Sequence, residues 1–149
     1  TVSAQALAPA LTTSMLRAVR SSAMISGFVI FFSMLVALMR ESGLFTAASG
    51  ALLNLLPQLG IGRCEALLMG LLELGSGVAS LGVLEPGPLG LALAAFILGW
   101  GGLCVQLQTA AVLSESGLRC TREAVLGKAA HAVLSAALAF FAGTVFFGA

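Results

Sequence analysis

Glu73 is the residue in this sequence whose type and setting best suit chemistry. It lies in the middle of the apolar stretch "CEALLMGLLELGSGVASLGVL", residues 64–84. A carboxylate at the centre of a bilayer costs about 2.5–3.5 kcal/mol, so it normally faces a cavity or the interior of a helical bundle. Behind it, Gly75-Ser76-Gly77 weakens a helix, and a break there would free backbone groups to meet a ligand. Glu73, Ser76 and Gly77 are therefore candidate solute-binding residues.

A packing role for the same segment is the alternative. On a helical wheel, small or polar residues gather on the side of Glu73, and leucines cover the other side. The small or polar set consists of Ala66, Met69, Gly70, Ser76, Gly77 and Ser80. Small residues let a second helix approach closely, and Glu73 would then hydrogen-bond across that contact. We favour the role at a cavity, because an ionisable group inside a membrane is a functional candidate by default.

The second candidate region is "FILGWGGLCVQLQTAAVL", residues 96–113, in which Trp-Gly-Gly is followed by two glutamines. Gln106 and Gln108 share a side in an extended segment, where both amides could reach one polar ligand, but they point about 200° apart on a helix. On a helix, Gln106 would bond a neighbouring helix and Gln108 would lie near the interface. Trp100 could stack on an aromatic ligand or act as a packing and anchoring residue. The candidate binding residues of this region are Trp100, Gly101, Gly102, Gln106 and Gln108.

The composition predicts that lipid surrounds most of this chain. Hydrophobic residues make up 59% and charged residues 9% of its 149 positions, whereas a soluble domain carries about a quarter of charged residues. The net charge of +1 provides no basic patch for nucleic acid. We therefore expect an integral membrane protein in a lipid bilayer. The predicted fold class is all-α, a polytopic membrane helical bundle with a broken helix and a re-entrant helical hairpin.

The apolar segments differ in length. Residues 21–39 carry no charge and predict a transmembrane helix, because about 20 residues cross a hydrocarbon core of about 30 Å. Residues 5–20 predict a weak amphipathic helix that lies at the interface or continues into that span. Residues 44–58 predict a short interfacial or buried helix, or a strained span. Residues 64–84 are long enough to cross, and residues 124–147 form a final span.

Residues 89–113 are predicted to form the re-entrant hairpin. The stretch from Leu89 to Leu98 has ten residues and the stretch from Leu103 to Leu113 has eleven, and each is shorter than the roughly 17 residues of a crossing helix. A single span centred on Trp-Gly-Gly is the alternative. We favour two half-helices that enter and leave on one membrane face.

No catalytic or metal-binding set is visible in the sequence. The single histidine, His131, has no aspartate partner because the chain lacks Asp, which excludes the commonest triads and metal arrangements. We expect His131 to pack and hydrogen-bond rather than to relay protons. Cys64, Cys104 and Cys120 have no paired spacing and are expected to be small, half-buried side chains. The prediction is a protein that is not an enzyme and uses no cofactor or metal.

Three stretches carry a family resemblance. "GLLELGSG" (70–77), "AAFILGWGGLCVQLQTAAVL" (94–113) and "SGFVIFFSMLVALM" (26–39) resemble the YlbJ-type sporulation integral membrane proteins. These proteins belong to the group with the nucleoside-recognition, or Gate, domain, and the resemblance covers roughly residues 15–147. That group is distantly similar to the C-terminal half of concentrative nucleoside transporters. In those transporters an acidic residue on a broken helix and a re-entrant hairpin help form the nucleoside and cation site.

The resemblance implies a multi-pass protein of the bacterial cell membrane with a role in sporulation. Glu73 matches the acidic position, and residues 96–108 match the hairpin tip. Leu72 stands where the transporters have asparagine, and Gly101-Gly102-Leu103 stands where they have a serine-rich tip. The implied function is recognition or translocation of a nucleoside-like solute or an ion. Residues 1–149 would form one Gate-like module, paired with the remaining half of a parent chain or with a second copy. A non-transporting scaffold that binds a partner is the alternative.

Overall fold

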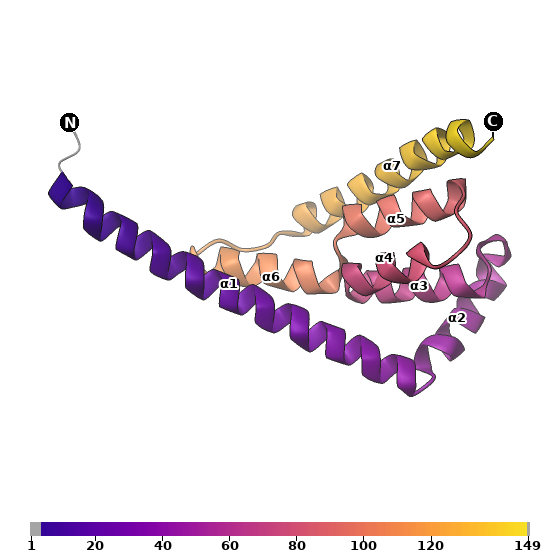
Figure 1. The fold of residues 1–149 in the computed structure, drawn as a ribbon, viewed down its shortest axis with the longest axis horizontal. Helices are drawn as coiled ribbons and strands as arrows, with labels where there is room; N and C mark the ends of the chain where they lie inside the picture. Colours follow the sequence, from indigo (N-terminus) through magenta and orange to yellow (C-terminus); the bar gives the residue numbers. More distant parts are fainter. Residues whose placement is uncertain (1–3, 149) are drawn as a thin grey trace.

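The described part of the chain is built from helices. The computed structural model describes residues 4–148, in which helices α1 to α7 and the short 3-10 helix η1 are joined by turns, with no strand in this range (Figure 1). The prediction of an all-α fold is therefore confirmed. Three segments are long and apolar enough to cross a membrane, namely Leu7–Glu41, Pro88–Glu115 and Arg122–Phe147. These lengths and compositions are those of a multi-pass membrane protein.

Helix α1 (Ala4–Glu41) is continuous, and its N-terminal end extends beyond the other helices (Figure 1). The two elements expected within residues 5–39 are thus one helix. The chain then turns at Gly43, whose φ of 73° is a left-handed conformation that glycine adopts without steric cost. Helix α2 (Leu44–Leu55) follows and has only 12 residues, fewer than a crossing helix needs. Of the alternatives for residues 44–58, the short helix is the one that the structure supports.

The next two helices form a helical hairpin. After η1 (Pro57–Leu59), α3 (Ile61–Leu72) runs in one direction and α4 (Leu74–Gly82) returns beside it (Figure 1). Residues 64–84 are long enough to cross as one helix, but the chain reverses between α3 and α4 instead.

Side-chain contacts also join the two arms of the α3–α4 hairpin at a distance from its turn. At its open end, the guanidinium Nη2 of Arg63 donates to the carbonyl oxygen of Glu85 at 3.1 Å. Between this end and the turn, the hydroxyl of Ser80 lies 3.4 Å from the sulfur of Met69. Helices α3 and α4 are therefore paired over most of their length.

The hairpin predicted for residues 89–113 is wrong. Helix α5 (Pro88–Trp100) packs on α7, whereas α6 (Gly102–Glu115) packs on α1 and α3, and the two helices follow one another along the long axis (Figure 1). Gly101 and Gly102 join them with φ of 80° and 71°. This junction displaces the helix axis without reversing it. Each half is too short to cross alone, but in series they form a 28-residue segment that can cross.

Helix α7 (Arg122–Phe147) runs antiparallel to α5 and covers the whole length of α5. Glycines bring the two backbones together at both ends of this contact. A Cβ atom on Gly99 would lie 2.9 Å from the Cα of Ala132, and one on Gly143 would lie 2.7 Å from the Cα of Pro88. The predicted final helix is confirmed, and close approach through small residues fixes it on α5.

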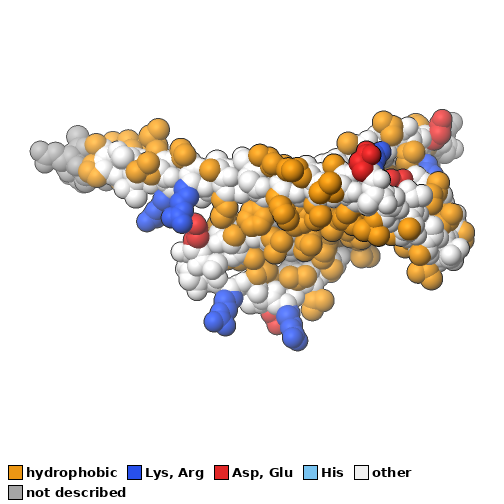
Figure 2. Space-filling model, turned by 90° about the horizontal axis from the view of Figure 1, so that it is seen from below, with side chains coloured by type: hydrophobic (Ala, Val, Ile, Leu, Met, Phe, Trp, Pro, Cys, Tyr) orange, Lys and Arg blue, Asp and Glu red, His pale blue; other side chains and the backbone are white. Residues whose placement is uncertain are grey.

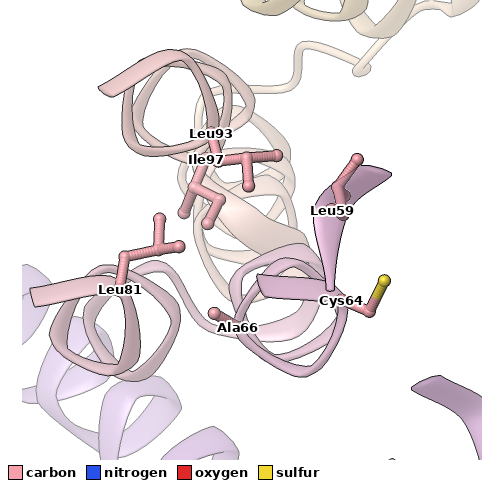
Figure 3. Close-up of a cluster of buried hydrophobic side chains, with 6 residues drawn as sticks. All are labelled: Leu59, Cys64, Ala66, Leu81, Leu93 and Ile97. Carbon is pink, nitrogen blue, oxygen red and sulfur yellow. The ribbon is translucent and has the colours of Figure 1, made fainter. Parts of the chain in front are cut away.

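The buried core is small and lies where η1, α3, α4 and α5 meet. Figure 3 shows its members, Leu59, Cys64, Ala66, Leu81, Leu93 and Ile97. A second cluster joins Val36 of α1, Phe45 of α2 and Met69 of α3. Many large apolar side chains of α1 and α7 remain exposed, and Figure 2 shows a broad hydrophobic area with charged side chains at its margins. These surfaces are suited to contact with lipid.

Candidate functional site

Glu73 lies at the turn of the hairpin and begins α4. Its backbone is extended, with φ of −141° and ψ of 116°, and the residue is 8% exposed. The carboxylate accepts hydrogen bonds from the N–H of Gly75 at 2.8 Å and from the N–H and the hydroxyl of Ser76, both at 2.7 Å. It therefore caps the N–H groups that the start of a helix leaves unpaired.

This cap explains how a charge is tolerated among apolar helices. Hydrogen bonds to a charged acceptor are strong, and the positive end of the α4 dipole stabilises the negative charge of Glu73. The helix break predicted at this point is confirmed. The backbone groups that the break frees are engaged by Glu73 itself, so a ligand would meet the carboxylate rather than bare N–H groups.

The small residues around Glu73 form the inner face of the hairpin. A Cβ atom on Gly77 would overlap the backbone of Gly70 and lie 2.9 Å from the carbonyl oxygen of Ala66. The packing interpretation of these residues is thus correct in part: a helix does approach closely, but it is the second half of the same segment. Gly77 consequently has a structural role and cannot touch a solute.

Gly101 and Gly102 place the second helix break against the first. A Cβ atom on Gly102 would lie 3.0 Å from the carbonyl oxygen of Leu72 and 3.1 Å from the N–H nitrogen of Leu74. These two residues flank Glu73 in the sequence. The break between α5 and α6 therefore contacts the turn between α3 and α4, and a side chain at residue 102 would crowd that contact. We call this place the break junction, formed by residues 72–74 and 100–102.

Trp100 also belongs to the break junction. Its indole N–H donates to the carbonyl oxygen of Leu71 at 3.4 Å, one of the carbonyl groups that the end of α3 leaves without a helical partner. The tryptophan is half-buried, so part of its ring remains open to a neighbour. Trp100 thus ties the end of α5 to the end of α3.

Gln106 and Gln108 do not converge on one point. Both lie on α6, which is helical from Gly102, and the extended segment that would align them is absent from residues 102–115. The Gln106 amide donates to the carbonyl oxygen of Trp100 at 3.5 Å, which keeps it at the break junction. The Gln108 amide is buried and contacts the sulfur of Cys104 at 3.1 Å. The interpretation that the two amides share a ligand is therefore wrong.

Lys128 is a member of the site that the sequence analysis did not select. Its ammonium nitrogen lies 3.6 Å from the point where a Cβ atom on Gly101 would be. A positive charge at the C-terminal end of α5 is favourable, because that end carries the negative pole of the helix dipole. The signal in the sequence was the charge itself, a lysine inside the apolar stretch from 124 to 147.

A cavity of about 500 Å³ with a mixed polar and apolar lining lies between α1 and the hairpin. Its lining is drawn from α1, α3 and α4, and comprises Ser33, Val36, Ala37, Arg40, Glu41, Met69, Ser76, Ala79, Ser80 and Val83. The size falls within the range of small-molecule sites, about 300–1,000 Å³. Ser76, which donates to Glu73, connects this cavity to the break junction.

Metal-ligating residues are scattered through the described chain. Within residues 4–148, no three His, Cys, Asp or Glu side chains lie close enough together to hold a metal ion. Cys64 and Cys104 are buried, whereas Cys120 is exposed. The candidate site is therefore made of one carboxylate, one ammonium, amides, an indole and backbone groups.

Comparison with protein-family models, with curated proteins and with solved structures finds no match to this chain. The resemblance to the Gate group consequently stays a prediction from the sequence. What the site can do follows from its own residues and their arrangement.

Proposed function

We propose that this chain is an integral membrane module that recognises and translocates a small polar solute, such as a nucleoside-like molecule or an ion, at the break junction. The observation that carries the proposal is the contact of Gly102 with residues 72 and 74, which brings two interrupted helices together beside a carboxylate. Secondary transporters bind solutes in the same kind of place, where discontinuous helices meet near the middle of the bilayer.

Helix lengths support a position near the middle of the membrane. Helix α3 has 12 residues and α5 has 13, which correspond to about 18 and 20 Å at 1.5 Å per residue. Both start at the same end of the molecule (Figure 1). Starting from one membrane face, each would reach beyond the midpoint of a hydrocarbon core of about 30 Å. The α3–α4 hairpin would then be re-entrant, and α5 and α6 would form a broken span.

The distribution of basic residues supports an orientation. The end of the molecule where Arg20 pairs with Glu115 at 3.4 Å carries Arg17, Arg20, Arg119 and Arg122. The other end carries Arg40 and Arg63. Cytoplasmic segments are enriched in Lys and Arg. The end with Arg20 would therefore face the cytoplasm, and the hairpin would enter from the opposite side.

The break junction offers the groups that a polar solute requires. Glu73 can accept hydrogen bonds from hydroxyl or amino groups, Gln106 presents an amide, and the partly open Trp100 ring can stack on an aromatic ring. Lys128 supplies the opposite charge beside Gly101. Such a set suits an uncharged, hydroxylated aromatic solute or a small cation better than an anion.

The cellular setting in sporulation and the Gate-like module over residues 1–149 come from the family resemblance. Transport also needs a second half, because sites of this kind form between repeated halves of a transporter. The exposed apolar surfaces of α1 and α7 provide area for a parent chain or for a second copy. A scaffold role is the second candidate, but the small-residue face proposed to bind a partner helix is occupied by the hairpin itself.

A ligand-induced melting shift tests the proposal. The detergent-solubilised protein is screened with nucleosides, bases and small cations, and we expect one class to raise its melting temperature by about 3 °C or more. Glu73→Gln keeps an acceptor oxygen but removes the charge, and should abolish the shift. Glu123→Gln, which changes an exposed carboxylate at the start of α7, should retain it. Equal shifts for the wild type and Glu73→Gln would rule out the charged site, and a stable partner complex without any solute shift would favour the scaffold.

A further inference from the structure

The cavity between α1 and the hairpin has hydroxyl groups on both of its sides, set among apolar side chains. Helix α1 contributes Ser33 and α4 contributes Ser76 and Ser80. Hydroxyl groups that face lipid gain no hydrogen bonds from it, so polar groups at this depth normally face water or protein. The cavity reaches Arg40 and Glu41 at the end of α1, where charged side chains mark the edge of the apolar region. It therefore extends from one end of the molecule toward the break junction.

The inner end of the cavity lies beside the carboxylate of Glu73. The hydroxyl of Ser76 lines the cavity and donates to Glu73 at 2.7 Å, so its oxygen lone pairs remain free to accept from water or to coordinate a cation. The hydroxyl of Ser80, one helical turn nearer the opening, contacts only the sulfur of Met69 among the described residues. Hydroxyl oxygens are thus spaced along the wall that leads to the carboxylate.

Charge along the cavity is negative on balance. Glu41 and Arg40 offset each other at the opening, and a smaller adjoining cavity of about 120 Å³ adds Glu65 beside Arg40. The inner end lies beside Glu73, and Lys128, the cation of the break junction, is not among the residues that line this cavity. A groove with low-dielectric walls concentrates ions of the sign opposite to its own.

We infer that the groove between α1 and α4 is a water-filled, cation-selective route that connects the Arg40 end of the molecule with Glu73. The inference rests on the proposed function and specifies it: small cations are the class of ion that reaches the break junction, and they come from the membrane face at which the hairpin begins. Ser33, Ser80 and Ser76 provide the oxygen atoms along the route.

Thiol accessibility tests the route without a known solute. In a background that lacks the native cysteines, single cysteines replace Ala37, which lines the groove, and Leu38, its neighbour at the same depth, which is 66% exposed and lies outside the groove lining. In lipid nanodiscs, a water-soluble methanethiosulfonate should modify Ala37→Cys at least about tenfold faster than Leu38→Cys, because thiols react as thiolates in water. Equal rates, whether both slow or both fast, would overturn the route.

Charge selectivity is measured with Ser80→Cys and two reagents, one carrying trimethylammonium and one carrying a sulfonate. The rate ratio, normalised to that for free 2-mercaptoethanol, should favour the cationic reagent by about tenfold. Adding Glu73→Gln should reduce this preference, whereas adding Glu123→Gln should leave it unchanged. A ratio near one, or one that Glu73→Gln does not alter, would overturn the selectivity.

The two proposals can fail separately. If the labelling pattern is absent but a solute still shifts the melting temperature, the cation route is refuted and solute recognition at the break junction stands. If the labelling pattern is present but no solute shifts the melting temperature, solute recognition is refuted and the cation route to Glu73 stands.

Discussion

The α3–α4 and α5–α6 segments contain the same parts, two short apolar helices around a break, and yet the first turns back while the second continues. In the first, the break is an extended residue whose carboxylate caps the next helix. In the second, the break consists of two glycines with positive φ and no side-chain cap. Either kind of break frees backbone groups, so the break alone does not decide where the chain goes.

The position of small residues does account for the difference. Gly70 and Gly77 lie on either side of Glu73 and allow the two halves of the first segment to touch. In the second segment, Gly99 faces Ala132 of α7, so α5 is held by another helix and not by α6. In the first segment, Gly77 lets α4 lie directly on the backbone of Gly70, and close approach of this kind stabilises helix pairs in lipid.

Breaking the hairpin should have the largest effect on stability. Gly77→Val places a side chain into the backbone of Gly70, which cannot move aside, and we expect a loss of about 3 kcal/mol. Gly82→Val, on the same helix with open space around its Cβ position, should cost much less. Melting of the two purified variants in detergent provides the measurement. Similar losses for both would mean that α3 and α4 are not in close contact.

Disturbing the break junction should have an intermediate effect. Gly102→Ala introduces a Cβ atom 3.0 Å from the carbonyl oxygen of Leu72 at a residue with φ of 71°. Gly117→Ala is a matched control, because its φ is 73° and no atom lies within 4 Å of its Cβ position. Both variants carry the cost of a left-handed alanine, so the extra loss for Gly102→Ala, about 1 kcal/mol, reports the contact. Equal melting temperatures for the two variants would mean that the two helix breaks are not in contact.

The ion pair at the far end of α6 should contribute least. Arg20 and Glu115 are 3.4 Å apart, but their side chains are 79% and 41% exposed. Exposed pairs contribute about 0–1 kcal/mol and are screened by salt. We expect Glu115→Gln to change the melting temperature slightly at low salt and not at all in 1 M salt. A large loss that persists at high salt would show that α1 and α6 depend on each other more than the structure indicates.

Periodicity and length predicted the helices, but they did not predict which broken segment turns back as a hairpin and which continues as a span. The span at residues 21–39, the final helix and the break beside Glu73 followed from local patterns of apolar, charged and glycine residues. Which of the two segments forms the hairpin and which the span did not follow, because half-helices of 9 to 14 residues satisfy the length rule in either arrangement. The distribution of Arg residues did not help, since both arrangements place Arg20 and Arg40 on opposite sides of the membrane.

The candidate site was predicted unevenly for a related reason. Glu73, Trp100 and Gln106 were recognised because a polar or aromatic residue in an apolar stretch is visible locally. Lys128 and the wall formed by Ser33 were missed, because their places depend on how α7 and α1 pack against segments 27 or more positions away in the sequence. Gln108 was assigned to the site from an extended conformation that α6 does not have.

The labelling side of residue 85 tests the central claim most directly. Single cysteines are placed at Ser42, Glu85 and Ser116, all exposed, in a protein without native cysteines. In sealed vesicles of one orientation, an impermeant maleimide should label Ser42→Cys and Glu85→Cys from the same side and Ser116→Cys from the other. Labelling of Glu85→Cys from the side of Ser116→Cys would show that residues 64–84 cross the membrane and that the hairpin lies in residues 89–113, contradicting the account.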